Sequence, residues 1–323
     1  MNQNTHSKKT AGAGFSSHTS RYHNLTNGLL IAMLLAGGAC ILILSPSQES
    51  GMTQAGLILL MVIIQHYLQN LQHEAAHYKL FTSRFWNDVF GHGICSVLFM
   101  ESLDSYRKFH FEHHRFLLDP LKDPEVEAYR QQSYEFKPMN WQHLLKNSIL
   151  DLTGWHWIQF RWHGLIRAEA FRPGSIAERW GLTLATILIM LIYTAGLMSA
   201  FGRYWILPQM TLLFFLGKVQ GYGEHGPRGG TIEQSTYIHK QFLFVRCIIW
   251  PLNADCHCIH HRNPKIPWYR LRTNALEYGA EDSHSKNSLD GLIWGTNPLL
   301  KQVLVTNPKR GRSSSMFFSQ PID

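Results

Sequence analysis

Residues 51–77 read GMTQAGLILLMVIIQHYLQNLQHEAAH. The run up to Ile64 carries no charged side chain, and the stretch ends in two histidines, His73 and His77, four positions apart. A helix brings positions four apart to one face, so the two imidazoles point the same way. His-Glu-x-x-His on a helix is the signature of zinc peptidases, in which the glutamate acts as a base. The stretch therefore predicts a helix that leaves a membrane and ends at a metal site.

Further apolar runs occupy residues 28–44, 181–201 and 205–217, and each approaches the roughly 20 residues that cross a bilayer. The polar remainder lowers the mean hydropathy of the chain to −0.15. We predict an all-α membrane protein with about four transmembrane helices in two hairpins, near residues 28–44, 51–70, 181–201 and 205–221. Basic residues before the first run also fit a signal peptide, but the second run follows so closely that an uncleaved anchor is predicted.

Lysine and arginine predict the orientation of these helices. The links inside the two hairpins are SPSQES and FGRY, and Arg203 is their only basic residue. The segments outside the hairpins are rich in lysine and arginine. Excess positive charge marks the cytoplasmic side. Both termini and the histidine-rich segments are therefore predicted to be cytoplasmic, which in a bacterial cell would place the protein in the inner membrane. The net charge of +8 fits attraction to anionic headgroups, and no motif for nucleic-acid binding accompanies it.

Three regions are predicted along the chain: a disordered tail over residues 1–20, a membrane domain with a helical cap over 21–305, and a flexible basic tail over 306–323. Within the domain, residues 141–162 (WQHLLKNSILDLTGWHWIQFRW) combine apolar, basic and tryptophan side chains at helical spacing. Tryptophan favours the headgroup layer. We therefore expect an interfacial helix there, and another over residues 85–99.

Clustered histidines are the strongest chemical signal. The chain has 19 histidines, and two further clusters read HFEHH at residues 110–114 and HCIHH at residues 257–261. We call HEAAH and these two clusters the three histidine boxes. His225, in GEHG at the end of the fourth apolar run, is a further candidate ligand. These histidines exceed the three or four ligands of one zinc ion, so two metal ions are predicted, and imidazole suits zinc, copper, iron and nickel alike.

The remaining histidines and the cysteines have plainer interpretations. Isolated histidines are expected to be packed or surface residues, namely His6, His18, His23, His143, His156, His163, His239 and His284, and His66 and His92 also lack clustered neighbours. Cys256 and Cys258 flank His257, but zinc modules usually separate paired cysteines by two residues. The five cysteines are therefore predicted to be reduced thiols.

Four segments together resemble the membrane fatty-acid desaturase family, in its bacterial form. They are HEAAHYKLFTSRFWNDVFG, HHRFLLDPLKDPE, GEHG and HHRNPKIPWYRL, and the resemblance extends from about Gly51 to Leu271. It implies a mushroom-like helical fold, in which a transmembrane stalk carries a cytoplasmic cap with a di-iron site. The third box departs from the pattern of many relatives at Asp255 and Cys258, which leaves the substrate class open.

By motif match, the resemblance assigns the iron ligands as His73, His77, His110, His113, His114, His225, His257, His260 and His261. Metal-bound histidines usually donate their other N–H to a carboxylate or a carbonyl, and the candidates for that role are Glu74, Asp104, Glu112, Asp119, Asp123, Glu224 and Asp255. Glu74 would then support a ligand instead of acting as a base. The implied activity inserts a double bond into a fatty-acyl or lipid-like chain. It would use two Fe²⁺ ions, O₂ as co-substrate, and electrons from a separate ferredoxin, flavodoxin or cytochrome.

Several alternatives remain open at this point. Within the same superfamily they are a hydroxylase, a ketolase, an alkene-forming decarboxylase and a desaturase of a specialised-metabolite precursor. A membrane zinc peptidase accounts for HEAAH only. A metal transporter or sensor would also use histidine clusters, but transporter sites normally lie near the bilayer midplane, whereas the boxes are predicted at the cytoplasmic ends of the helices. A ferritin-like carboxylate site needs paired Glu-x-x-His motifs, which Glu74 with His77 and Glu281 with His284 satisfy in spacing.

Overall fold

The computed structural model describes residues 17–45, 50–94, 99–134, 136, 138–166, 175–226, 236–277, 288–289 and 299–304. The chain divides into two compact units. Unit 1 comprises Met1–Arg107 with Ala170–Trp205, and unit 2 comprises Lys108–Glu169 with Ile206–Asp323. Helix α4 (Leu103–Arg115) begins in unit 1 and continues into unit 2.

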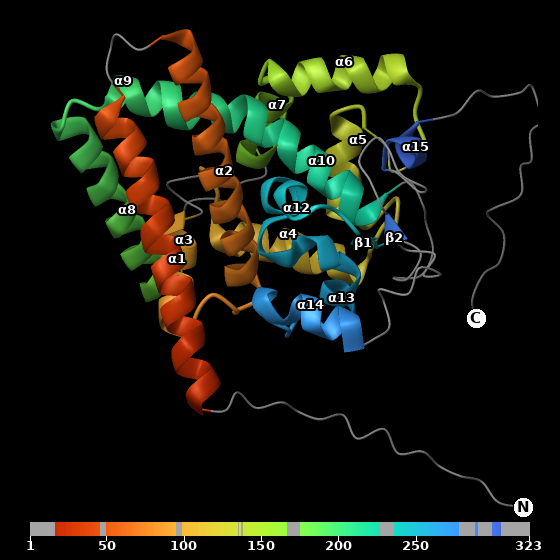
Figure 1. Cartoon of the computed structure of the whole chain (residues 1–323), viewed down its shortest axis with the longest axis horizontal. Coiled ribbons are helices and arrows are strands. Elements are labelled where there is room, and N and C mark those ends of the chain that lie inside the picture. Colours follow the sequence, from red (N-terminus) through yellow and green to blue (C-terminus); the bar gives the residue numbers. More distant parts are fainter. Residues whose placement is uncertain are drawn as a thin grey trace, which may run out of the picture. The chain divides into compact units, whose positions relative to one another are not determined.

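Unit 1 is built from long apolar helices (Figure 1). Its elements are α1 (Ser17–Leu44), α2 (Gly51–Ala76), α3 (Arg84–Gly93), α8 (Ile176–Thr194) and α9 (Met198–Phe201). Helix α1 packs against α2, and α3 packs against α8. Serine side chains at positions 50, 83 and 175 cap the first turns of α2, α3 and α8 by accepting backbone N–H hydrogen bonds, which satisfies donors that have no partner inside a helix.

Three of these helical segments are long and apolar enough to cross a membrane: Tyr22–Leu44, Gly51–Ala76 and Ile176–Thr194. Large apolar side chains along them are exposed, including Met33, Leu59 and Leu191. Such exposure is costly in water and ordinary in lipid. The first three of the four apolar helices predicted from the sequence are therefore present.

The boundaries of these helices differ from the predicted ones. Helix α1 begins at Ser17, inside the segment predicted as a disordered tail, while residues 1–16 lie outside the described part of the chain. Helix α8 covers Ile176–Thr194 instead of residues 181–201. It starts early because the Ser175 side chain accepts the backbone N–H of Glu178. It ends early because Gly196 has a φ of +71°, a left-handed conformation that terminates helices.

Close approach of α3 and α8 depends on a missing side chain. A Cβ atom at Gly181 would lie 2.6 Å from the Cβ of His92 and 2.8 Å from the carbonyl oxygen of Val89. Both distances are far below van der Waals contact, so only glycine fits here. This position fixes how tightly α8 can pack on α3.

The fourth predicted apolar segment is helical but interrupted. After α9, the chain forms two π-helical turns, η2 (Gly202–Ile206) and η3 (Gln209–Leu213), and continues as α10 (Phe214–His225). Pro208 lies between the two π turns, where its missing N–H disturbs regular α-helical hydrogen bonding. None of these separate elements reaches the length of the three spans above.

Unit 2 is also mainly helical. Its further elements are α5 (Pro124–Gln131), α6 (Trp141–Leu152), α7 (Trp155–Ile166), β1 (Ile238–His239), α12 (Leu243–Ile249), η4 (Pro251–Cys256), α13 (His257–Arg262), α14 (Trp268–Glu277), β2 (Ser288–Leu289) and α15 (Leu299–Val303). The two short strands pair in parallel. The all-α prediction missed this small pairing.

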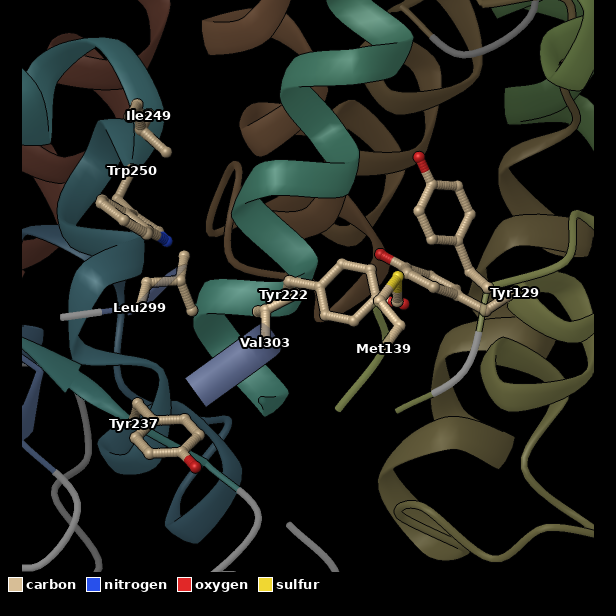
Figure 2. Packing of buried hydrophobic residues seen from close by; sticks show 9 residues of the cluster. Tyr129, Met139, Tyr222, Tyr237, Ile249, Trp250, Leu299 and Val303 are labelled. Atoms are coloured by element: carbon tan, nitrogen blue, oxygen red, sulfur yellow. The ribbon is translucent and has the colours of Figure 1, made fainter. Parts of the chain in front are cut away.

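An aromatic cluster forms the core of unit 2 (Figure 2). Tyr129, Tyr222, Tyr237 and Trp250 are buried there with several aliphatic side chains. Helix α10 packs against α6, α12 and α15, and it supplies Tyr222 to the centre of the cluster. Tyrosine and tryptophan contribute large apolar surfaces to this core, which holds the end of α10 in place.

The segment predicted as one interfacial helix forms two helices. α6 ends at Leu152 and α7 begins at Trp155, because Gly154 between them has a φ of +80°. Each helix exposes a row of apolar side chains at helical spacing: Trp141, Leu145, Ile149 and Leu152 on α6, and Trp155, Ile158 and Trp162 on α7. The other expected interfacial helix is α3, which exposes Phe85 and Trp86 and is followed by residues 95–98, outside the described part.

Candidate metal centre

The second and third histidine boxes lie on two helices of unit 2. Helix α4 carries His110, His113 and His114, α10 ends at His225, and α13 carries His257, His260 and His261. A tight turn precedes α13, because Leu252 and Asn253 in η4 have φ values of +59° and +57°. This turn starts α13 directly at His257, and the spacing of three and four residues then places the imidazoles of each box on one side of its helix.

Four of these histidines converge on one point, and we call them the four-histidine group. Its members are His113, His225, His257 and His261, all buried. The Nε2 atom of His225 lies 3.1 Å from those of His113 and His257, and the Nε2 atoms of His257 and His261 are 3.0 Å apart. Nitrogen ligands about 2.1 Å from a shared ion lie about 3.0–3.4 Å from one another. The group therefore has the spacing of a metal site.

Three more histidines form a second cluster, the three-histidine group. The Nε2 atom of His114 lies 3.0 Å from that of His110 and 3.0 Å from that of His260. The rings of His114 and His261 stack with centroids 4.1 Å apart, so the two groups adjoin within unit 2. Each group therefore presents converging imidazole nitrogens that could hold a metal ion.

Burial favours the neutral imidazoles that bind metals. Burial lowers the pKa of His261 well below its usual value, and the neighbouring imidazoles of His257, His225 and His114 lower it further. For His113, burial also opposes the charged form, but the Glu125 and Asp123 carboxylates outweigh it and raise the pKa. The two carboxylates thus oppose, at His113, the effect of burial that dominates at His261.

The first histidine box belongs to unit 1. His73 lies in the last turn of α2 and His77 is the C-cap residue of that helix. Their ring centroids are 5.0 Å apart, as the spacing of four predicted. Glu74 is buried, with its Oε1 atom 3.8 Å from Nδ1 of His73, which places this carboxylate beside the expected ligand and beyond hydrogen-bond distance.

Two of the predicted supporting carboxylates contact box histidines. Both oxygens of Asp123 lie 3.0–3.1 Å from Nδ1 of His113. Oε1 of Glu224 lies 3.7 Å from Nδ1 of His257 and accepts a hydrogen bond from the Gln220 amide at 2.6 Å. Both carboxylates are therefore on the Nδ1 side of the imidazoles, opposite the converging Nε2 atoms.

Asp255 and Asp104 pair with arginines, contrary to the prediction that they support histidines. Asp255 is buried and forms ion pairs with Arg246 at 2.9 Å and with Arg272. The Asp104 side chain is 55% exposed and accepts a hydrogen bond from Arg107 at 2.7 Å, and the nearest nitrogen of His92 is 3.9 Å away. Proximity in sequence to a box did not determine where these side chains point.

The other two predicted carboxylates also lie away from the imidazoles. Asp119 accepts the backbone N–H groups of Leu121 and Lys122 at 2.9 and 3.1 Å, so it stabilises the turn after α4. Glu112 is half-buried, and in the described part of the chain no ion pair joins its carboxylate to a histidine. We assign neither residue to the metal centre.

One carboxylate at the centre was missed in the sequence. Oε2 of Glu125 lies 3.0 Å from Nδ1 of His113. Asp123 is the N-cap of α5, and its side chain accepts the backbone N–H of Glu125 at 2.9 Å. A signal for Glu125 was available, since an N-cap aspartate followed by proline places the next glutamate in the first helical turn beside it.

Histidines outside the boxes are packed or surface residues where their side chains are described, and His163 is an exposed one. His156 lies 2.7 Å from Asp151, and His239 stacks on Trp250 with centroids 3.9 Å apart. Cys256 and Cys258 are buried and pack in a small apolar cluster, as expected for reduced cysteines. The alternative pair Glu281 and His284 lies outside the described residues.

The donor set fits a metal ion. Each group contains imidazole nitrogens that lie 3.0–3.1 Å from one another. Carboxylates at Nδ1 of His113 can orient that ring. Such nitrogen-rich sets bind zinc, copper, iron and nickel. The geometry therefore supports metal binding by the histidine clusters without selecting the element.

The comparisons with known proteins agree with this arrangement. The model of the fatty acid desaturase family matches residues 51–285, which include all three histidine boxes and His225. The chain is also 26% identical over 227 residues to dihydrorhizobitoxine desaturase from Bradyrhizobium elkanii. That alignment covers 66% of this chain and 64% of the relative, so the chain spans less than two thirds of the relative's length. The chain belongs to the fatty acid desaturase family.

Proposed function

We propose that this protein is an O₂-dependent membrane desaturase that uses two iron ions to introduce a double bond into a fatty-acyl or lipid-like chain. The convergence of Nε2 atoms in the four-histidine group is the observation that carries the proposal. The family match supports a desaturase-type oxidoreductase. A bound iron pair would supply, with O₂, the oxidising power needed to remove hydrogen from an unactivated carbon.

Each ion has its own ligand set in this proposal. The four-histidine group binds one ion. The three-histidine group binds the other. His73 and His77 are proposed as further iron ligands on the resemblance alone, because HEAAH is its first box. A set of only His110, His114 and His260 leaves coordination positions open on an ion that accepts more ligands than tetrahedral zinc.

The surrounding carboxylates act on the ligands, not on the substrate. Asp123 and Glu125 hold the proton of His113 at Nδ1, which leaves Nε2 free to bind metal. Glu224 takes the same place toward His257 at a longer distance of 3.7 Å. The contacts of Asp123 and Glu125 therefore orient the ring of His113, and Glu224 lies nearby on the Nδ1 side of His257.

The acyl or lipid-like substrate would reach the protein from the membrane that the protein spans. We propose that the three spanning helices are joined by a fourth crossing formed by residues 198–225, in which Pro208 and the π turns locally distort the helix. The apolar rows of α6 and α7 lie in the headgroup layer, where tryptophans are favoured. The histidine boxes and both termini face the cytoplasm, and electrons come from a separate ferredoxin, flavodoxin or cytochrome.

A second candidate is a desaturase of a specialised metabolite. The relative at 26% identity is named for dihydrorhizobitoxine and not for a fatty acid. Hydroxylation of the same substrate classes would use the same ligands, as would ketolase or alkene-forming chemistry. The product distinguishes these reactions, because desaturation removes two hydrogens and hydroxylation adds one oxygen.

The test combines metal analysis with product analysis. Purified protein is expected to contain two iron ions per chain, and cells that express it under O₂ are expected to accumulate a lipid or metabolite that is lighter by two hydrogens than its precursor. Cells that express the His261→Ala variant serve as the control. One zinc ion per chain, or a product heavier by one oxygen, would contradict the desaturase proposal.

A further inference from the structure

In the core of unit 2, Tyr134 lies beside a group that can accept its proton. Its side chain is buried, with 2% exposure, and its hydroxyl donates a hydrogen bond to Asp151. The second oxygen of Asp151 lies 2.7 Å from Nδ1 of His156. The break at Gly154 brings the end of α6, with Asp151, beside the start of α7, with His156. A buried phenol bonded to a buried carboxylate can lose its proton without moving.

A continuous row of aromatic rings joins Tyr134 to the four-histidine group. The ring centroid of Phe136 lies 6.3 Å from that of His225, and that of Tyr222 lies 5.5 Å from Phe136. The Tyr134 ring follows at 5.7 Å from Tyr222. Every member of this row belongs to unit 2. Rings in contact leave only short gaps across which a single electron can tunnel between Tyr134 and the imidazole of His225.

The surroundings distinguish Tyr134 from the neighbouring Tyr129. The ammonium nitrogen of Lys218 lies 3.7 Å from the centroid of the Tyr129 ring and 5.5 Å from that of Tyr134. A positive charge over a ring opposes removal of an electron from it. In the described part of the chain, no carboxylate accepts a hydrogen bond from the Tyr129 hydroxyl, whereas Asp151 accepts one from Tyr134. Tyr134 is thus the easier of the two to oxidise.

We propose that Tyr134 is a one-electron donor that returns the metal centre to a lower oxidation level when O₂ has oxidised it and no substrate is bound. The inference rests on the proposed function. The electron passes from the Tyr134 ring through Tyr222 and Phe136 to the metal held by His225. The O–H bond of Tyr134 breaks at the same time, and its proton goes to the Asp151 carboxylate. A neutral phenoxyl radical remains, and an external one-electron reductant such as ascorbate restores the phenol.

Electron paramagnetic resonance tests this directly. The reduced, iron-loaded full-length protein is mixed with O₂ without substrate and frozen at successive times. The wild type is expected to show a tyrosyl radical, whose hyperfine pattern changes when the protein is grown with ring-deuterated tyrosine. Tyr134→Phe is expected to lose the signal while binding the same amount of iron. Tyr129→Phe, which also removes a buried hydroxyl from this cluster, is expected to keep it.

Repeated exposure to O₂ gives a second readout. Without substrate, Tyr134→Phe is expected to lose bound iron and accumulate oxidised ligand histidines faster than the wild type and faster than Tyr129→Phe. Absence of a tyrosyl signal in an iron-loaded wild type that consumes O₂ and forms product would overturn the role of Tyr134 and leave the proposed function intact. An equal signal in Tyr134→Phe would overturn it as well. A protein that binds iron but neither consumes O₂ nor forms a radical would contradict both.

Discussion

The carboxylate of Asp123 lies with both oxygens 3.0–3.1 Å from Nδ1 of His113, and the same carboxylate caps helix α5. One side chain therefore orients a ring of the four-histidine group and starts the helix that carries Glu125. This double role couples the local fold after the second box to the geometry of the metal centre.

Replacement of Asp123 with asparagine is expected to weaken metal binding. Loss of a carboxylate partner of a ligating histidine typically lowers metal affinity by about 10- to 100-fold, while asparagine still serves as an N-cap. Titration of the purified protein with a competing chelator measures the affinity. Asp119→Asn, in the turn nearby, is the matched control and should leave the affinity unchanged. Equal affinities for the Asp123 variant and the wild type would refute the orienting role.

Removal of one ligand from each cluster is expected to abolish oxidation. His110→Ala affects the three-histidine group and His261→Ala affects the four-histidine group. Both variants should insert into the membrane normally, because the apolar helices are unchanged. Product formation in cells and the amount of protein in membrane fractions check the two statements. His163→Ala, at an exposed position on α7, is the control. Retained activity in either ligand variant would reject the ligand assignment.

His239 is expected to make stability depend on pH. Burial lowers its pKa to about 4 in the folded chain, whereas an unfolded histidine titrates near 6.5. Between these two values only the unfolded chain binds the proton, so the free energy of unfolding falls as the pH decreases. The loss is at most about 3 kcal/mol, reached near pH 4.

The variant His239→Phe isolates this contribution. Phenylalanine keeps a ring against Trp250 but carries no titratable group, so the decrease in unfolding free energy between pH 6.5 and 4 should be smaller than in the wild type. Denaturant unfolding followed by tryptophan fluorescence at several pH values measures the difference. Parallel curves for the two proteins would show that His239 does not titrate as its burial requires.

Packing of α8 on α3 is expected to fail when Gly181 gains a side chain. A Cβ atom there would meet His92 and the Val89 carbonyl at 2.6 and 2.8 Å. Overpacking of this kind typically costs about 1–3 kcal/mol. Thermal unfolding in detergent should therefore show a lower midpoint for Gly181→Ala. Gly56→Ala in α2, where no atom lies within 4 Å of the added Cβ, should be neutral or slightly stabilising. Equal midpoints for the two variants would contradict the packing argument.

The part of the site that follows from local spacing could be predicted from the sequence. Offsets of three and four residues place His110, His113 and His114 on one side of α4, whatever surrounds the helix. The same holds for the third box on α13. Asp123 was among the carboxylates predicted to support a ligand, and both of its oxygens lie beside Nδ1 of His113.

Other features depend on contacts between segments far apart in the sequence, and sequence reasoning failed there. Asp255 precedes the third box by two residues, yet its side chain turns to Arg246 and Arg272. Glu125 was missed because its role follows from the cap that Asp123 makes. The breaks at Gly154 and Gly196 depend on single left-handed residues, which averaged hydropathy over a window does not detect.

The crowding of imidazole nitrogens in the four-histidine group has a consequence for the life of the protein in the cell. Four buried rings with Nε2 atoms 3.0–3.1 Å apart cannot satisfy every one of these contacts with a hydrogen bond, because each Nε2 atom either carries one proton or only accepts one. An ion resolves this conflict and adds its binding energy to folding. A chain synthesised under metal starvation would thus open more often and reach proteases sooner. Its abundance would follow nutritional metal supply even where transcription stays constant.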